Sequence, residues 1–117
     1  MIRMAVNKRG KHSFVPSKPV YITGWASVAG EKESNGPLAG QFDIVSKDTK
    51  FGQSTWEQAE KHMQQLALET LCHKSNLTIN QIDLVFSGDL LNQCVGSSFS
   101  LRNTGIPHLG LYGACST

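Results

Sequence analysis

The chain has 117 residues, of which 39% are hydrophobic and 17% charged, and its formal net charge is +2. This composition is typical of one globular domain with a modest core, and it excludes a disordered chain or one built of membrane-spanning segments. The small net charge gives no argument for nucleic-acid binding, and the three cysteines and four histidines are too widely spaced to indicate a zinc site. No secretory signal follows the basic start, so we expect a cytosolic chain with reduced cysteines.

Residues 1–18 are predicted to be a polar lead-in, and residues 19–117 to be the folded domain. We interpret the positive charge of the lead-in as that of a solvated tail rather than a binding arm. Its basic side chains include Arg3, Lys8, Arg9 and Lys11.

A first strand is predicted over residues 19–29, because residues 20–23 are β-branched or aromatic and Pro19 is confined to the start. The polar stretch 30–52 that follows is longer than an ordinary connection in a compact domain. Two interpretations of it are equally open, a functional loop or a surface insertion pinned to the body by a few apolar residues.

An amphipathic helix is predicted over residues 54–74. Ser54 and Glu57 have the spacing of a capping box, and apolar residues then recur at helical intervals. We expect this helix to lie on a sheet, burying Trp56, Ala59, Met63, Leu66, Ala67 and Leu71.

The second half of the chain alternates between strand and helix patterns. One helical turn at 78–81 precedes a buried strand over 82–87, and a helix near 92–103 precedes a final strand over 108–112. The whole order predicts an α/β fold, a parallel-rich sheet with flanking helices, in which strands 20–28, 82–87 and 108–112 are neighbours.

Cys115 follows the last strand at a turn of small residues, Gly113 and Ala114. Ser116 and Thr117 are residue types that are favoured at the start of a helix, and such a helix would lower the pKa of the thiol. The sequence stops at Thr117, so we expect the chain to hold only the front part of such a site.

Ligands of open parallel sheets bind beyond the carboxyl ends of the strands. Two stretches are predicted to meet at that edge, one from Gly88 to Gln93 and one from Gly113 to Thr117. Their meeting favours a site, although turn chemistry alone explains Gly88-Asp89.

These stretches, together with Pro19-Val20-Tyr21-Ile22, Gly36-Pro37-Leu38 and Trp56-Glu57-x-Ala59-Glu60, resemble the stage V sporulation protein AD family of spore-forming bacteria. The resemblance covers residues 11–117, and it rests most on Gly-Asp-Leu-Leu-Asn-Gln combined with Gly-Ala-Cys-Ser-Thr. It implies an incomplete βαβαβ portion of the N-terminal half of a thiolase-like, five-layered fold.

The family resemblance also implies a function. Its members bind dipicolinic acid, a pyridine dicarboxylate, and help move it with calcium into the forespore and out again at germination. The implied location is the forespore cytoplasm, peripheral to the spore inner membrane, in a channel complex of several proteins. A homodimer as in thiolases is also implied, and no metal or cofactor of its own.

On this interpretation the ligand-binding candidates are Asp89, Asn92, Gln93, Cys115 and Ser116. Backbone N–H groups and the amides of Asn92 and Gln93 can donate hydrogen bonds to carboxylates. The carboxylate of Asp89 would repel a dianion unless calcium bridges the two or the carboxylate caps its own loop. We favour the role as a loop cap.

Two alternatives remain. The first is a thiolase-like or ketosynthase-like acyltransferase with Cys115 as nucleophile. It needs a base, and His108 at the far end of the last strand is a poor one. The second is a truncated, non-catalytic fragment.

Overall fold

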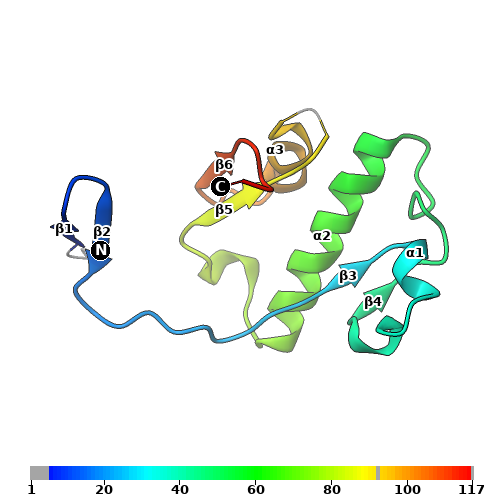
Figure 1. Cartoon of the computed structure of the whole chain (residues 1–117), viewed down its shortest axis with the longest axis horizontal. Helices are drawn as coiled ribbons and strands as arrows, with labels where there is room; N and C mark the ends of the chain where they lie inside the picture. The colour runs from blue at the N-terminus through cyan, green and yellow to red at the C-terminus, as the bar shows by residue number, and fades with distance from the viewer. Residues whose placement is uncertain (1–5, 92, 117) are drawn as a thin grey trace.

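The computed structural model describes residues 6–91 and 93–116, and these form a mixed α/β structure of short strands and helices (Figure 1). The longest helix, α2, packs against the short helix α3, which in turn contacts the parallel pair β5–β6. The predicted α/β class is confirmed at this level. The elements are β1 (Val6–Arg9), β2 (Ser13–Pro16), β3 (Val28–Ala29), α1 (Glu31–Ser34), η1 (Ala39–Gln41), β4 (Ile44–Val45), α2 (Trp56–Lys74), η2 (Ile79–Gln81), β5 (Val85–Gly88), α3 (Val95–Leu101) and β6 (His108–Leu111).

The predicted helix over 54–74 is confirmed as α2, with its cap one residue later than expected. The side chain of Thr55, not Ser54, accepts a hydrogen bond of 3.2 Å from the backbone N–H of Gln58. An oxygen-bearing side chain at this position satisfies one of the N–H groups that the first helical turn leaves without a partner.

The apolar stripe of α2 is less buried than the sequence predicted. Ala59 is buried and Met63, Leu66, Ala67 and Leu71 are half-buried, because α3 and β3 cover the helix only in part. The prediction that Trp56 is buried is wrong. Its side chain is 51% exposed, and its ring lies 5.1 Å from the Nζ atom of Lys50 in the preceding loop.

Strands β5 and β6 are parallel neighbours, as predicted. Val85 pairs with His108 and Gly88 with Leu111, so both strands end at the same edge. The capping box of Thr78 and Gln81 at the start of η2 is also present.

The first predicted strand does not join this sheet, so the prediction of three neighbouring strands is wrong. Only residues 28–29 form a strand, and β3 pairs in parallel with β4. Two hydrogen bonds beside the strands explain why β3 pairs with β4. Asp43 accepts a hydrogen bond of 2.8 Å from the Ser27 N–H, and the Ile44 N–H donates to the Ser27 carbonyl at 3.1 Å. Closing this short loop costs less chain entropy than reaching β5.

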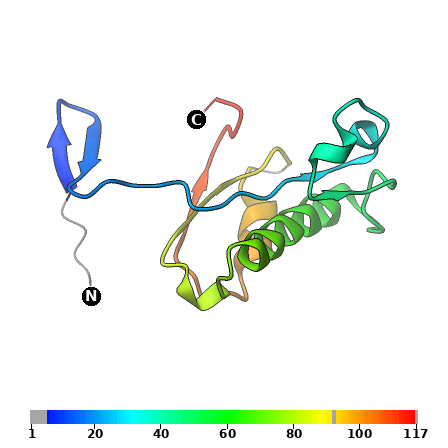
Figure 2. The same ribbon diagram turned by 90° about the horizontal axis from the view of Figure 1, so that it is seen from below.

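Residues 19–27, predicted as strand, instead run as an extended segment that is exposed over 19–23 and half-buried at Gly24, Ala26 and Ser27 (Figure 2). Val20 and Ile22 are 76% and 89% exposed. Strand-forming side chains do not make a strand by themselves, because the backbone also needs a hydrogen-bonding neighbour.

The predicted lead-in contains a β-hairpin that the sequence analysis did not anticipate. β1 and β2 pair antiparallel, and Gly10 in the connecting turn has a φ of 70°. A left-handed backbone of this kind suits glycine, which has no Cβ. In Figures 1 and 2 the hairpin stands apart from the body of the molecule.

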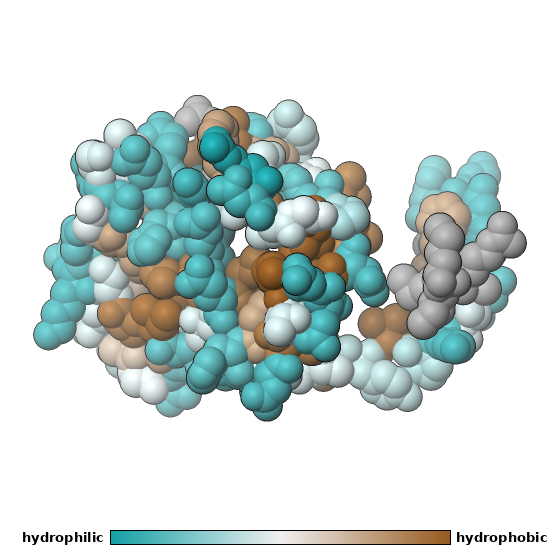
Figure 3. All heavy atoms as spheres, turned by 180° about the vertical axis from the view of Figure 1, so that it is seen from behind, coloured by the Kyte–Doolittle hydropathy of each residue, from teal (hydrophilic) through white to brown (hydrophobic). Residues whose placement is uncertain are grey.

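The buried apolar core of the described residues is small, and it comprises Ala29, Ala59 and Leu101. Larger apolar side chains lie at the surface of the body in separate patches between polar ones (Figure 3).

Candidate functional site

The two loops that follow β5 and β6 touch each other, as the sequence predicted. A methyl group added at Gly88 would lie 2.8 Å from the Cβ atom of Ala114, closer than two carbons pack. Gly88 ends β5 and Ala114 lies just beyond β6, so glycine at position 88 lets the second loop cross the end of the first strand. We call the meeting point of residues 88–91, 93–94 and 112–116 the rim.

A hydrogen bond from one loop to the other closes the rim. The side-chain oxygen Oε1 of Gln93 accepts from the backbone N–H of Gly113 at 3.1 Å. Gln93 and Cys94 have φ angles of 40° and 68°, in the left-handed region that residues other than glycine rarely adopt. Each such residue costs roughly 1–3 kcal/mol and persists only where its surroundings hold it, which happens often at functional sites.

Asp89 supplies much of that support. It is 3% exposed, and its Oδ1 accepts from the Cys94 N–H at 2.6 Å. Its Oδ2 accepts from both the N–H and the hydroxyl of Ser97, at 2.8 and 2.9 Å. Burial raises the pKa of this carboxyl, but the hydrogen bonds from Ser97 and Cys94 outweigh burial and hold the pKa below its usual range. The carboxylate therefore points inward and holds the loop at the start of α3.

Glu60 of α2 holds the same loop from the other side, which sequence reasoning missed. Its two carboxylate oxygens accept from the backbone N–H groups of Leu90 at 2.8 Å and Leu91 at 3.2 Å. Glu60 lies three residues before Met63, and residues with this spacing share a helix face. The position of Glu60 at the border of the apolar stripe of α2 was the signal in the sequence that could have indicated this contact.

Cys115 and Ser116 lie at the exposed end of the rim. Residues 114–116 form a turn, in which the Ser116 N–H donates to the Gly113 carbonyl at 2.7 Å and its hydroxyl donates to the same oxygen at 3.0 Å. The structure therefore brings together Asp89, Gln93, Cys115 and Ser116 in one region, whereas the predicted ligand-binding residue Asn92 lies outside the described residues.

His108 lies at the beginning of β6, at the other end of the strand from Cys115, as its position in the sequence implied. Its Nε2 atom is buried and has no hydrogen-bond partner among the described residues, and the same holds for the Oγ atom of Ser87. A Cβ atom placed on Gly110 would lie 3.0 Å from the Sγ atom of Cys94 and 3.6 Å from this Nε2 atom. The absence of a side chain at Gly110 thus lets the start of α3 approach the sheet.

A pocket of about 400 Å³ lies between α2 and α3, and it adjoins the rim through Val95 and Gly96. Charged side chains of both signs line it, among them Glu57, Lys61 and Arg102. This mixed lining gives the pocket no evident selectivity for an anion. Within residues 6–91 and 93–116, no group of three or more histidine, cysteine or acidic side chains is arranged to hold a metal ion. No helix in this part of the chain is long and apolar enough to cross a membrane.

Comparisons with known proteins agree with the resemblance read from the rim motifs. The sequence profile of the family described as Stage V sporulation protein AD (SpoVAD) matches residues 10–117. The Stage V sporulation protein AD of Bacillus subtilis (strain 168) is 39% identical over 108 residues, which are 92% of this chain and 32% of that protein. The chain thus spans about a third of the length of this relative.

Proposed function

The chain belongs to the stage V sporulation protein AD family, and from this premise we propose that its rim forms part of a dipicolinic acid site in a spore protein of thiolase-like fold. The protein would support uptake of dipicolinic acid into the forespore and its release at germination. It would act in the forespore cytoplasm as a peripheral member of a membrane channel complex. A thiolase-like homodimer is part of the same proposal.

One observation carries the proposal. The Gln93–Gly113 hydrogen bond fastens the two loops of the family motifs to each other, so that their side chains form one surface. The Nε2 group of Gln93 is a donor on this surface, and the Ser116 hydroxyl can become one by turning away from the Gly113 carbonyl to which it donates. Both groups match the carboxylates of a small aromatic dianion.

Within this proposal Asp89 is a positioning residue, because its carboxylate is used by Cys94 and Ser97. Calcium would enter as a companion of the ligand. The described residues offer it no ready cluster of their own.

The test compares this chain with a chimera in which residues 10–117 replace the matching third of the Bacillus subtilis relative. Dipicolinate is titrated into each by calorimetry, with and without calcium. We expect the chimera to bind and the chain alone to bind more weakly. A chimera without affinity for dipicolinate would contradict the ligand assignment.

Side-chain variants of the chimera test the rim itself. Gln93→Ala and Ser116→Ala should each weaken binding about tenfold or more, the usual loss for a hydrogen bond to a charged group. Gln41→Ala removes the same amide from an exposed position in η1 and should leave binding unchanged. Unchanged binding in both rim variants would place the site elsewhere.

Acyl transfer with Cys115 is the second candidate function, and the exposure of this thiol is the observation in its favour. The reaction also needs a base beside the sulfur and donors for the oxyanion. His108 is separated from Cys115 by the length of β6, so it is not placed to serve as this base. We therefore propose binding rather than turnover.

A further inference from the structure

Positive charge is concentrated at the start of the chain. The first 30 residues contain no acidic side chain, whereas all nine acidic residues lie from Glu31 onward, where only six basic residues accompany them. The chain is therefore a cationic segment followed by a weakly anionic body, although its net charge is only +2. The basic residues of the first segment are Arg3, Lys8, Arg9, Lys11 and Lys18.

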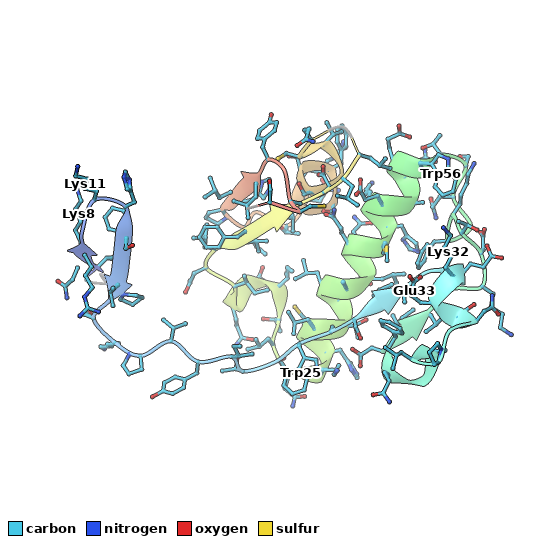
Figure 4. The ribbon with its side chains drawn as sticks, viewed as in Figure 1. Lys8, Lys11, Trp25, Lys32, Glu33 and Trp56 are labelled. Atoms are coloured by element: carbon cyan, nitrogen blue, oxygen red, sulfur yellow. The ribbon has the colours of Figure 1, made fainter. Side chains whose placement is uncertain are left out.

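The hairpin of β1 and β2 presents this charge together with apolar side chains. All eight of its strand residues are exposed, and Phe14 is 68% exposed. In the register, Lys8 faces Phe14 and Val6 faces Pro16, so these four side chains share one face of the hairpin. Figure 4 shows Lys8 and Lys11 on this hairpin, well away from Lys32, Glu33 and Trp56 in the body.

The extended segment after the hairpin continues the same surface chemistry. Tyr21 and Trp25 are 76% and 72% exposed, and Val20 and Ile22 are more than three-quarters uncovered as well. Aromatic rings with one polar end are the side chains that prefer the boundary between water and lipid. A two-stranded hairpin is also only marginally stable in water, so it would be stabilised by a surface.

We propose that the hairpin and the segment 17–25 bind the surface of an anionic membrane. The basic groups would be attracted to the headgroups, while Phe14 and its neighbours on the same face enter the boundary region. The long side chain of Lys8 can lie along this apolar face with its charge in water. This inference refines the peripheral location proposed above, and it differs from the solvated tail that the charge pattern alone favoured. Its experiment contains no dipicolinate, so the failure of one proposal is distinguishable from the failure of the other.

The experiment is co-sedimentation of the whole chain with vesicles of phosphatidylcholine, with and without phosphatidylglycerol. We expect binding to the anionic vesicles alone, weakening as salt is added. Each basic residue near such a surface contributes about fivefold in affinity, so Lys8→Glu with Lys11→Glu should lower partitioning about thirtyfold or more. The matched control, Lys32→Glu with Lys47→Glu, makes the same change of charge on exposed side chains of the body and should lower it far less.

Phe14→Ser tests the apolar part, and it should weaken vesicle binding even at high salt. Equal binding to neutral and anionic vesicles, or equal loss in the hairpin and control variants, would overturn the proposal. So would no effect of Phe14→Ser. Tighter binding to a single-stranded RNA than to anionic vesicles would overturn the choice of partner. Circular dichroism of each variant confirms that the helical content is retained, since all the substituted residues are exposed.

Discussion

Asp89→Ala is the substitution that most directly tests how the rim is held. The carboxylate accepts three hydrogen bonds, from the Cys94 N–H, the Ser97 N–H and the Ser97 hydroxyl. The hydroxyl has a second acceptor, the Cys94 carbonyl at 3.2 Å, so its loss is compensated. The two backbone N–H groups have no such substitute. Leaving a buried donor unpaired costs about 1–3 kcal/mol. Ser97 is fully buried but Cys94 only half-buried, so the Cys94 N–H should cost less, and we expect the rim and α3 to be destabilised by about 2–4 kcal/mol in total.

The assay is hydrogen exchange read residue by residue, because the effect is local. The Ser97 amide should exchange about 30-fold to 1,000-fold faster in Asp89→Ala, which is the expected free energy expressed as a ratio of rates. Asp83→Ala is the matched control, since it removes the same group from an exposed position just before β5. Unchanged protection of Ser97 in Asp89→Ala would refute the cap. Equal loss of Ser97 protection in Asp89→Ala and Asp83→Ala would show that removing either carboxylate destabilises the whole chain.

The acid dependence of the same site has a defined sign. The folded pKa of Asp89 lies below its usual value, so its contribution to stability is present above the unfolded pKa of about 3.9. That contribution is lost as the pH falls through the lower folded pKa. The difference in stability between the parent chain and Asp89→Asn should therefore be constant near neutral pH and shrink below about pH 4. A difference that grows as the pH falls would contradict this assignment.

Four further predictions concern the rim and the helix behind it. Gly88→Ala should destabilise the chain by about 1–3 kcal/mol through overpacking against Ala114, and adding Ala114→Gly should rescue it. Gly40→Ala, where an added Cβ has open space, should be nearly neutral. Denaturation of these three variants beside the parent chain measures the differences. Glu60→Gln should speed amide exchange at Leu90 and Leu91 while leaving Ser97 protected, because only the former donate to Glu60. Iodoacetamide should alkylate the exposed Cys115 before the half-buried Cys72 and Cys94, as peptide mass spectrometry would show, and the reverse order would contradict the described turn. Leu66→Ala should cost about 1–2.5 kcal/mol in unfolding free energy, half the range of a filled core site, because Leu66 is only half-buried.

The elements that the sequence predicted well are those specified by local pattern. The helical recurrence in α2 extends over nineteen residues, and no competing period is present. The apolar runs of β5 and β6 are each bounded by glycine, and two strands separated by a helix are expected to be parallel. Their common edge, and with it the meeting of the two motif loops, followed from topology alone.

Strand pairing at the start of the chain could not be predicted in the same way. The segment 19–27 has the side chains of a strand, but a strand also needs a neighbour with unpaired backbone groups. That neighbour was decided by Asp43, which accepts a hydrogen bond from the Ser27 N–H across sixteen residues. A bond of this kind leaves no periodic trace in the sequence. The hairpin was hidden for another reason, because its basic residues resemble those of a solvated tail.

The side-chain bonds of the rim lie between these cases. The sequence placed Asp89 and Gln93 in one loop, and the role of Asp89 as a cap was the interpretation that suited its charge. The bonds that Glu60 accepts from Leu90 and that Gln93 accepts from Gly113 span thirty and twenty residues. Only the fold brings these partners together.

The two carboxylates at the rim bear on whether an anionic ligand can bind there at all. Two uncompensated negative charges would repel a dianion, and the repulsion would be strongest where water is excluded. Here Asp89 accepts three hydrogen bonds in a buried or half-buried setting, and Glu60 accepts two at the surface. Each N–H or hydroxyl dipole points its positive end at a carboxylate, so much of the negative charge is balanced inside the loop. A ligand on the outer side would meet the Nε2 group of Gln93 first, and the Ser116 hydroxyl once it turns away from the Gly113 carbonyl. Asp89, the carboxylate that argues against a dianion from the sequence, is therefore, in the folded chain, one of the groups that hold the loop of Gln93 in place.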